Sequence, residues 1–286
     1  MPNRNKNWGF LLGYQAYVLA FLVFLIAPLL AAATFAFNDS LFPSLPWQGF
    51  TLDWFVGDSE PKLGVLHDRR LLRGVYYSFV IAGCVSVLSV LVGTTNAFLF
   101  VRHDFPAKNF LYIVMVVPLV IPGVILGISI LVLASSVANG VEEGLGIDLG
   151  FLRPGIFLVV MGQFSFITTI TSLVITARLK KFDPALEEAA FNLGASRARV
   201  LATVTLPFLR PAIIAAGIVG FLVSFENFNT TLFLVGSESP LTITMFDRMA
   251  KSGSTPVLNA ISVLLMVGSG GLALLSVLVQ RDRSRG

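Results

Sequence analysis

Between Arg73 and Arg102 the sequence reads GVYYSFVIAGCVSVLSVLVGTTNAFLFV (residues 74–101), without one charged side chain. A helix of roughly 20 residues crosses the hydrocarbon core of a bilayer, so this stretch is long enough to span it. Lipid offers the backbone no hydrogen-bond partners, which makes a helix the expected conformation. The stretch therefore predicts a membrane-spanning helix near residues 74–100.

Five further stretches share this absence of charge, apart from the single carboxylate of Glu226. With the first stretch, they predict spans near 14–36, 74–100, 110–135, 154–177, 208–233 and 257–279. The composition agrees, because charged residues make up 13% of the chain, against about 25% in soluble proteins. We therefore predict an all-α membrane protein, with six transmembrane helices in a single domain over residues 1–286.

The first apolar stretch has a second interpretation. Arg4 and Lys6, followed by apolar residues and the small residues 31–33, resemble a cleavable signal peptide. The apolar part, residues 17–37, is longer than the usual 7–15 residues of such a peptide. This length favours an uncleaved membrane anchor.

The charge distribution predicts the orientation. Six spans place both termini on one side of the membrane, and thirteen of the 20 lysines and arginines fall on that side. The positive-inside rule therefore predicts cytoplasmic termini. It also attributes the net charge of +4 to cytoplasmic loops rather than to nucleic-acid binding.

The residue inventory excludes several kinds of chemistry. Cys84 is the only cysteine, so an internal disulfide and a cysteine metal cluster are excluded. The two histidines, His67 and His103, lie outside the apolar stretches, and the chain has no H-E-x-x-H motif and no glycine-rich phosphate loop. We expect neither an enzyme nor a cofactor site.

The stretch between the fourth and fifth spans reads RLKKFDPALEEAAFNLGASRARVLATVTLP (residues 178–207). Asp183 and Pro184 are typical of a helix start, Gly194 of a left-handed stop, and Ser196 of a second helix cap. The pattern predicts two short cytoplasmic helices around a glycine turn. Such a hairpin suits either the lipid surface or a protein partner, whereas DNA binding is disfavoured because both ends are tethered to spans.

The spacing of this stretch resembles the EAA loop of the ABC importer permeases, the binding-protein-dependent inner-membrane components. Glu188-Ala189-Ala190 is followed after three residues by Gly194 and after nine more by Val204-Thr205-Leu206-Pro207, with valine where the family most often has isoleucine. The resemblance implies a type I importer permease in the bacterial inner membrane, and a coupling helix that docks on a separate ATPase. The coupling residues that it implies are Glu187, Glu188, Ala189, Ala190, Gly194, Leu206 and Pro207. It also implies a second permease subunit, identical or homologous, and an extracytoplasmic solute-binding protein.

Other motifs are similar to those of the spermidine/putrescine permeases. They are Asn38-Asp39-Ser40, residues 51–55 (TLDWF), residues 118–123 (PLVIPG) and Asn259-Ala260. Ser224-Phe225-Glu226 resembles their acidic stretch, although those permeases commonly carry two adjacent acids and Asn227 replaces one of them here. The resemblance implies a polyamine or a similar small solute.

Glu226 is the one charged residue that interrupts the apolar stretch 211–237, and a carboxylate at that depth is costly. We interpret it as part of the substrate pathway, with a protonated or paired structural carboxylate as the alternative. The polar residues that we group with it are Ser224, Asn227, Asn229, Thr168 and Ser172. For the serines and threonines, ordinary helix packing is the favoured interpretation.

Two further questions stay open from the sequence. Pro118, Pro122, Gly123 and Gly127 predict a softened third span, which fits a gating hinge and a static kink equally. An autonomous channel or secondary transporter that uses Glu226 as its cation or proton site is the alternative function. Such a protein needs no coupling loop, and internal repeats between residues 1–140 and 141–286 are not detectable.

Overall fold

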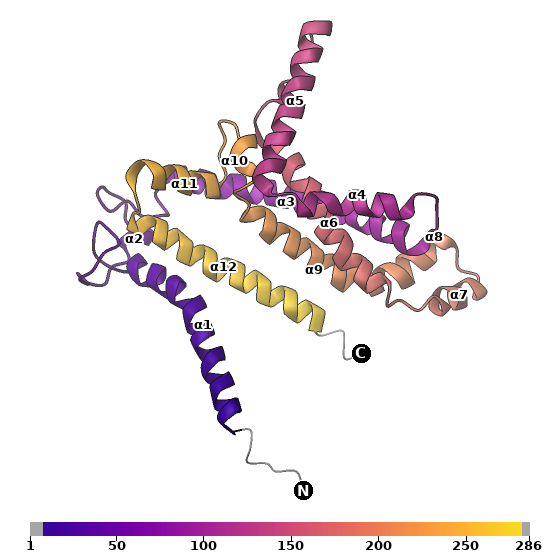
Figure 1. Cartoon of the computed structure of the whole chain (residues 1–286), viewed down its shortest axis with the longest axis horizontal. Helices are drawn as coiled ribbons and strands as arrows, with labels where there is room; N and C mark the ends of the chain where they lie inside the picture. Colours follow the sequence, from indigo (N-terminus) through magenta and orange to yellow (C-terminus); the bar gives the residue numbers. More distant parts are fainter. Residues whose placement is uncertain (1–7, 282–286) are drawn as a thin grey trace. The chain divides into compact units, whose positions relative to one another are not determined.

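The computed structural model describes residues 8–281, and these residues form helices joined by loops (Figure 1). Six helices are long and apolar enough to cross a membrane, as the sequence predicts. Within the described residues they are α1 (Trp8–Ala36), α3 (Arg69–Arg102), α5 (Gly123–Leu145), α6 (Ile156–Leu179), α9 (Leu206–Phe225, the last part of a helical run that begins at Arg197) and α12 (Pro256–Arg281).

Shorter elements connect them. These are α2 (Asp53–Val56), α4 (Lys108–Val120), α7 (Ala185–Asn192), α8 (Arg197–Val200), α10 (Thr231–Leu234) and α11 (Leu241–Ser252), with a 3₁₀ turn at Gly150–Leu152 and a π turn at Leu201–Thr205. Within residues 8–281 the only strand-like pairing is an isolated bridge between Asn38 and Phe50. The prediction of an all-α membrane protein is confirmed.

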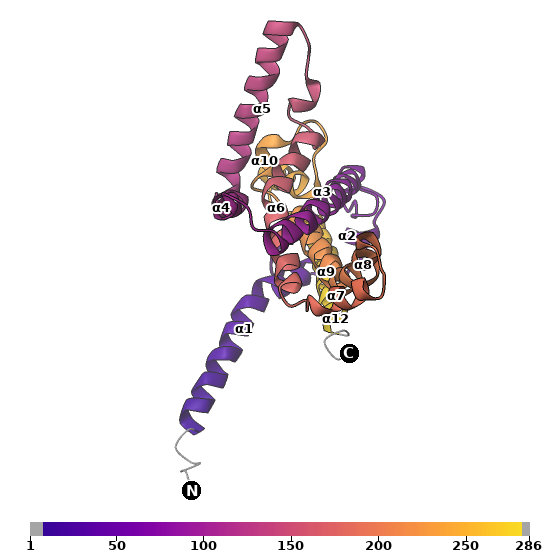
Figure 2. The same ribbon diagram turned by 90° about the vertical axis from the view of Figure 1, so that its right-hand side faces the viewer.

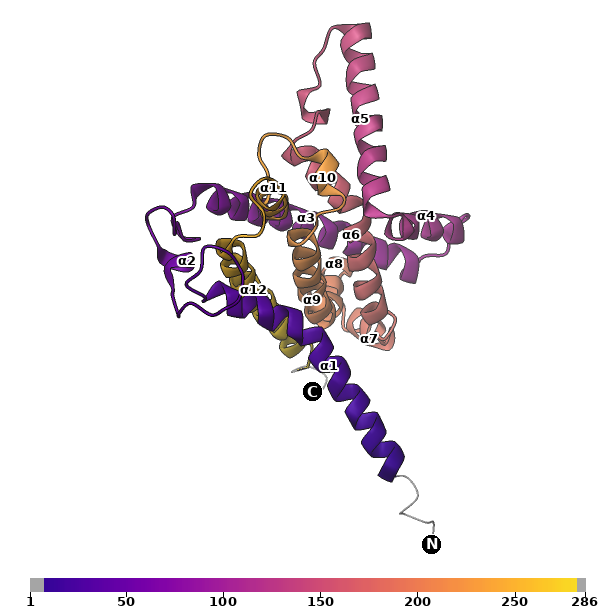
Figure 3. The same cartoon turned by 60° about the vertical axis from the view of Figure 1, so that its left-hand side comes forward.

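The predicted third span, 110–135, is two helices in the structure. Ile121 is extended, with φ −72° and ψ 130°, and it separates α4 from α5 at Pro122. A proline disfavours helical backbone at the residue before it, which explains the break. Figure 3 shows the sharp corner between the two helices, and it is α5, ending at Leu145, that has the length of a span.

The predicted fifth span, 208–233, also needs correction. Helix α9 ends at Phe225, and Glu226 is the residue that caps it, so this carboxylate is not in the interior of a continuous helix. Asn227 Oδ1 accepts hydrogen bonds from the Thr231 backbone N–H (3.3 Å) and from Thr231 Oγ1 (3.0 Å). Side chains that bond to nearby backbone groups compete with the helix, which explains why it stops here and α10 begins separately.

The chain divides into two compact units. The first comprises the chain up to Leu72 with Arg248–Gly268, and the second comprises Arg73–Asp247 with the chain from Ser269 onward. In the first unit, Asp68 accepts hydrogen bonds from the backbone N–H groups of Arg70 (3.0 Å) and Leu71 (3.1 Å) and forms an ion pair with Arg248. This carboxylate therefore stabilises the start of α3.

Helix α6 is the centre of the second unit. In its apolar window 61% of the residues are buried inside the chain, against 0% in α1. It lies beside α9 in Figures 1 and 2, and it contributes Leu158, Val159 and Ile167 to one apolar cluster and Ile175 and Leu179 to another. Figure 2 also shows the C-terminal part of α5 extending beyond the other helices of this unit. The site residues are therefore positioned by a helix that packs against protein along its length.

Candidate functional site

The stretch 178–207 has the two helices that its sequence predicts. Asp183 Oδ1 accepts a hydrogen bond from the Ala185 backbone N–H (3.0 Å), and Ser196 Oγ accepts one from the Arg199 backbone N–H (3.4 Å). Between α7 and α8, Gly194 has φ +84°, the left-handed region that favours glycine. Local sequence therefore determines the shape of this stretch.

Glu187 points from α7 into the protein. Its Oε1 accepts hydrogen bonds from Arg102 Nη2 (3.0 Å), at the end of α3, and from Thr205 Oγ1, in the π turn before α9. The Arg102 and Glu187 side chains are only 24% and 22% exposed, and Thr205 is fully buried. These three residues, which we call the Glu187 anchor, join α7 to two membrane helices.

Aromatic rings strengthen the same junction. Phe182, just after α6, and Phe208, in α9, meet edge to face with their ring centroids 5.1 Å apart. Arg102 lies over the Phe182 ring at 5.2 Å, and Arg178 lies over the Phe208 ring at 4.1 Å. Each such cation–π contact stabilises by roughly 0.5–2 kcal/mol. The stretch is therefore fixed to α6 at one end and to α9 at the other.

The opposite face of α7 is exposed and carries apolar groups. Leu193 is 88% exposed and Leu186 is 52% exposed. The adjacent Glu188 forms no ion pair with the residues that the structure describes. Among the other predicted coupling residues, Ala189, Gly194 and Pro207 are exposed, and Ala190 and Leu206 are half-buried. We call Leu186, Glu188, Ala189 and Leu193 the α7 ridge.

Several predicted pathway residues lie in a buried cluster of neutral polar groups. Ser224 Oγ donates to Gln163 Oε1, Gln163 Nε2 donates to Thr231 Oγ1 (2.8 Å), and Thr231 Oγ1 donates to Asn227 Oδ1 (3.0 Å). Gln163 is 1% exposed and Thr231 is fully buried. This Gln163 cluster, made of these four residues, joins α6, α9 and α10.

Thr168 and Ser172 lie where α6 packs against α3. Thr168 Oγ1 donates to Ser89 Oγ (3.3 Å), and Asn96 Nδ2 donates to Ser172 Oγ (3.3 Å). Both predicted residues are buried, at 7% and 0% exposed. Their geometry favours the helix-packing interpretation over a wall of the substrate pathway.

Glu226 and Asn229 are exposed at the end of α9. Glu226 forms no ion pair with any of residues 8–281. Its carboxylate is therefore not desolvated by this chain alone. The structure brings Ser224 and Asn227 together through the Gln163 cluster, but it does not bring Glu226 to Thr168 or Ser172.

Sequence reasoning missed Arg102, Phe182, Phe208 and Gln163. Gln163 had a signal, because it is the only amide in the charge-free stretch 154–177 and a polar side chain at that depth needs a partner. Arg102 and the two phenylalanines had none. Their roles depend on contacts between residues that are far apart in the chain.

The comparisons with known proteins agree with this architecture. Residues 75–283 match the model of the family described as "binding-protein-dependent transport system inner membrane component". The spermidine/putrescine transport system permease protein PotC of Escherichia coli (strain K12) is 27% identical over 290 residues, covering 100% of this chain and 98% of PotC. The putrescine transport system permease protein PotI of the same strain is 28% identical over 265 residues, covering 92% of this chain and 89% of PotI.

A solved structure supports the fold. It is the crystal structure of a bacterial ABC transporter involved in the import of the acidic polysaccharide alginate, with a TM-score of 0.72 and 18% identity. The match covers 98% of this chain and 96% of that chain. Together with the six apolar helices, the family match establishes that this chain is a multi-pass protein of the bacterial inner membrane and belongs to the family of binding-protein-dependent transport system inner membrane components.

Proposed function

We propose that this chain is the permease subunit of an ATP-driven importer, that it forms half of the translocation pathway, and that residues 178–207 couple it to a separate ATPase. The pathway is completed by a second permease, identical or homologous, and a solute-binding protein delivers the solute from outside. ATP is hydrolysed on the partner, since this chain has no phosphate loop. Membership of the importer family favours this function over an autonomous channel.

The observation that supports coupling most is the division of α7 into two faces. The inner face carries Glu187, which is bonded to Arg102 of α3 and to Thr205 before α9. The outer face carries the α7 ridge, where Leu193 is 88% exposed. When a partner that holds the α7 ridge moves, the Glu187 anchor transmits the movement to α3 and α9. Phe182 and Phe208 transmit it to α6.

A polar substitution on the ridge tests the docking role. Leu193→Asp places a carboxylate on the apolar ridge without disturbing any packing inside the chain. We expect the purified complex to lose its ATPase subunit, or its solute-stimulated ATP hydrolysis, while the permease still inserts. Leu145→Asp is the matched control, because Leu145 is 71% exposed at the far end of α5. Full coupling in Leu193→Asp would contradict the docking role.

The turn at Gly194 gives a second test of coupling. A Cβ at this position meets no atom within 4 Å, so a substitution acts only through the backbone conformation at φ +84°. Gly194→Val should tilt α7 and reduce transport and stimulated ATP hydrolysis together. Gly194→Asn should be milder, because asparagine tolerates this conformation. Equal activity of the glycine and valine forms would show that the orientation of α7 does not matter.

The proposed orientation places both termini and the α7 ridge in the cytoplasm. In a Cys84→Ser background, Ser196→Cys should react with impermeant thiol reagents only from the cytoplasmic side. Glu142→Cys should react only from outside. The reverse labelling pattern would overturn the orientation and, with it, the contact with the ATPase.

For the solute we propose a polyamine, or another small solute similar to it, by similarity to PotC and PotI. Glu226 is exposed at the end of α9, where a carboxylate attracts a cation that enters the pathway. Glu226→Gln keeps the size and removes the charge, so polyamine uptake should fall while assembly and basal ATP hydrolysis persist. Uptake of a neutral solute by the same complex is the control. Unchanged polyamine uptake would remove Glu226 from the pathway, and an assembly defect would make it a structural partner.

A further inference from the structure

The loop that follows α1 has an unusual surface. Residues 40–52, SLFPSLPWQGFTL, carry no charge between Asp39 and Asp53. Six of their large apolar side chains are exposed, among them Phe42 (66%), Leu45 (75%), Trp47 (46%) and Phe50 (69%). A polar loop in water does not need so many exposed apolar side chains, and apolar groups gathered on one short exposed segment are typical of an interaction site.

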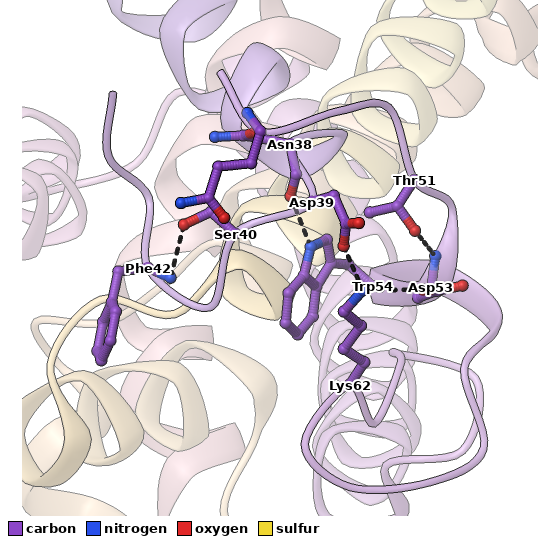
Figure 4. A network of polar contacts seen from close by, with 9 residues as sticks. Asn38, Asp39, Ser40, Phe42, Thr51, Asp53, Trp54 and Lys62 are labelled. Atoms are coloured by element: carbon purple, nitrogen blue, oxygen red, sulfur yellow. Dashed lines mark hydrogen bonds and ion pairs between the residues drawn. The ribbon is translucent and has the colours of Figure 1, made fainter. Parts of the chain in front are cut away.

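Internal hydrogen bonds hold the loop in one shape (Figure 4). Asn38, which is 1% exposed, donates from Nδ2 to the Ser44 carbonyl (3.1 Å) and accepts at Oδ1 from the Gln48 backbone N–H (2.9 Å). Its own carbonyl accepts a hydrogen bond from Trp54 Nε1 (2.9 Å). The polar groups therefore bond to one another inside the loop, and the apolar side chains remain outside.

The loop leaves and returns at the end of α1. The Asp39 backbone N–H donates to the Gly49 carbonyl, and the Thr51 backbone N–H donates to the Phe37 carbonyl, both at 2.9 Å. Phe37 also stacks on Phe50, with their ring centroids 5.4 Å apart. The chain between Asp39 and Gly49 leaves the end of α1 and returns to it. Half of this short segment, fully extended, reaches at most about 15 Å from the helix end. Its residues consequently stay close to the level at which α1 leaves the membrane.

The charged residues at the base of the loop form ion pairs with one another. The Lys62 ammonium group forms an ion pair with Asp39 and a second one with Asp53, at 3.4 Å from its Oδ2 (Figure 4). The hydrogen bond to Asp39 is the main cause that raises the pKa of Lys62, which keeps the ammonium charged. These charges are therefore satisfied within the first unit, and the exposed face of residues 41–50 presents mainly apolar groups.

We propose that residues 41–50 are an interfacial anchor, and that Phe42, Leu45, Trp47 and Phe50 insert between the lipid headgroups of the leaflet at which α1 ends. The occupant is lipid because this surface continues from α1, whose apolar window is 0% buried inside the chain. Tryptophan and other aromatic side chains are enriched at this level of the bilayer, where charged groups are disfavoured. The anchor fixes the depth and tilt of α1. This inference rests on the membrane location of the chain and not on the transported solute.

Spin labelling of the full chain in its complex tests the proposal in lipid nanodiscs. In a Cys84→Ser background, Phe42→Cys and Leu45→Cys carry the label, and Asp58→Cys, at an exposed position just after α2, is the control. We expect the spin labels at positions 42 and 45 to be relaxed more by oxygen than by a water-soluble nickel chelate. The label at position 58 should be relaxed more by the nickel chelate than by oxygen. Labels at 42 and 45 that respond mainly to nickel would place the loop in water and overturn the proposal. Labels that respond to neither reagent would show a protein partner there and overturn it as well.

The native tryptophan gives an independent readout. The chain has three tryptophans, so Trp8→Phe leaves Trp47 and the 4% exposed Trp54. Lipids brominated near the headgroup should quench the fluorescence of this variant, and the additional substitution Trp47→Phe should abolish most of the quenching. Quenching by aqueous iodide instead of brominated lipid would contradict the anchor. Addition of the solute-binding protein should change neither the oxygen response of the spin labels nor the quenching by brominated lipid. Loss of either one would show that this surface binds the solute-binding protein instead of lipid.

Discussion

The Glu187 anchor and the Gln163 cluster both join neighbouring helices of the second unit, but they use different chemistry. The anchor pairs two charged side chains, Arg102 and Glu187, that remain 24% and 22% exposed. The cluster uses an amide and hydroxyl groups, and its central residue, Gln163, is 1% exposed. One connection lies where α3, α7 and α9 begin or end, and the other lies within the packed length of α6.

The difference follows from the cost of burying polar groups. An ionised group that is fully withdrawn from water costs far more than a neutral amide, whose hydrogen bonds can be replaced one for one. Charge is therefore used at helix ends, where solvent still reaches the pair, and neutral groups are used at depth. The predictions below test this contrast, in order of decreasing expected effect.

The largest effect should come from pushing α10 away from the Gln163 cluster. A Cβ at Gly127 in α5 would lie 2.7 Å from the Thr230 backbone oxygen, and backbone cannot yield as a flexible side chain does. Gly127→Val should destabilise the fold by about 3 kcal/mol or more. Gly140→Val is the control on the same helix, since a Cβ there meets no atom within 4 Å. Size-exclusion profiles and melting temperatures of the two variants compare them, and equal behaviour would contradict the close approach of α10.

Removal of the central amide should have the next largest effect. Gln163→Leu leaves Ser224 and Thr231 without their buried partner, at an expected cost of about 1–3 kcal/mol. Ser165→Ala serves as the control, because Ser165 Oγ donates only to the Gly162 carbonyl of its own helix (2.7 Å). Chemical unfolding in detergent measures the difference. A Gln163→Leu protein as stable as the parent would mean that the cluster does not stabilise α6, α9 and α10.

The Glu187 anchor should contribute less to stability and more to coupling. Glu187→Gln keeps an acceptor for Thr205 but removes the ion pair with Arg102, which we expect to cost about 1 kcal/mol because solvent partly screens it. Glu188→Gln should leave stability unchanged and affect only the interaction with the ATPase. Unfolding and stimulated ATP hydrolysis, measured on both variants, separate the two carboxylates. Identical effects on both measurements would remove the distinction between the faces of α7.

The smallest effect belongs to an ion pair whose carboxylate is fully exposed. The hydrogen bond from Lys108 to Asp104 (2.8 Å) lowers the pKa of the Asp104 carboxyl. A lowered pKa in the folded protein stabilises it above the usual aspartate pKa, and this stabilisation is lost as the pH falls through the lowered value. Because the Asp104 side chain is 100% exposed, Lys108→Gln should leave the melting temperature at neutral pH unchanged. If Lys108→Gln lowered the melting temperature as much as Glu187→Gln does, the contrast between partly buried and exposed charges would be wrong.

The sequence alone determined the features that depend on neighbours in the chain. The absence of charge between Arg73 and Arg102 was enough to predict a membrane helix, since lipid permits few other conformations. Asp183, Gly194 and Ser196 specified the turn and the caps around α7 and α8, because each acts on the backbone within a few residues. The family resemblance rested on this same local spacing.

Tertiary structure alone decided which polar side chains meet. Glu187 and Arg102 are 85 positions apart, and Gln163 and Thr231 are 68 apart, so no spacing rule relates them. Two predicted spans stop for local reasons instead: Asn227 bonds to Thr231, four positions on, between α9 and α10, and Pro122 separates α4 from α5. A local pattern reports whether a helix is favourable in lipid and what interrupts it, whereas the partner of a buried polar group depends on what other segments bring to that point in space.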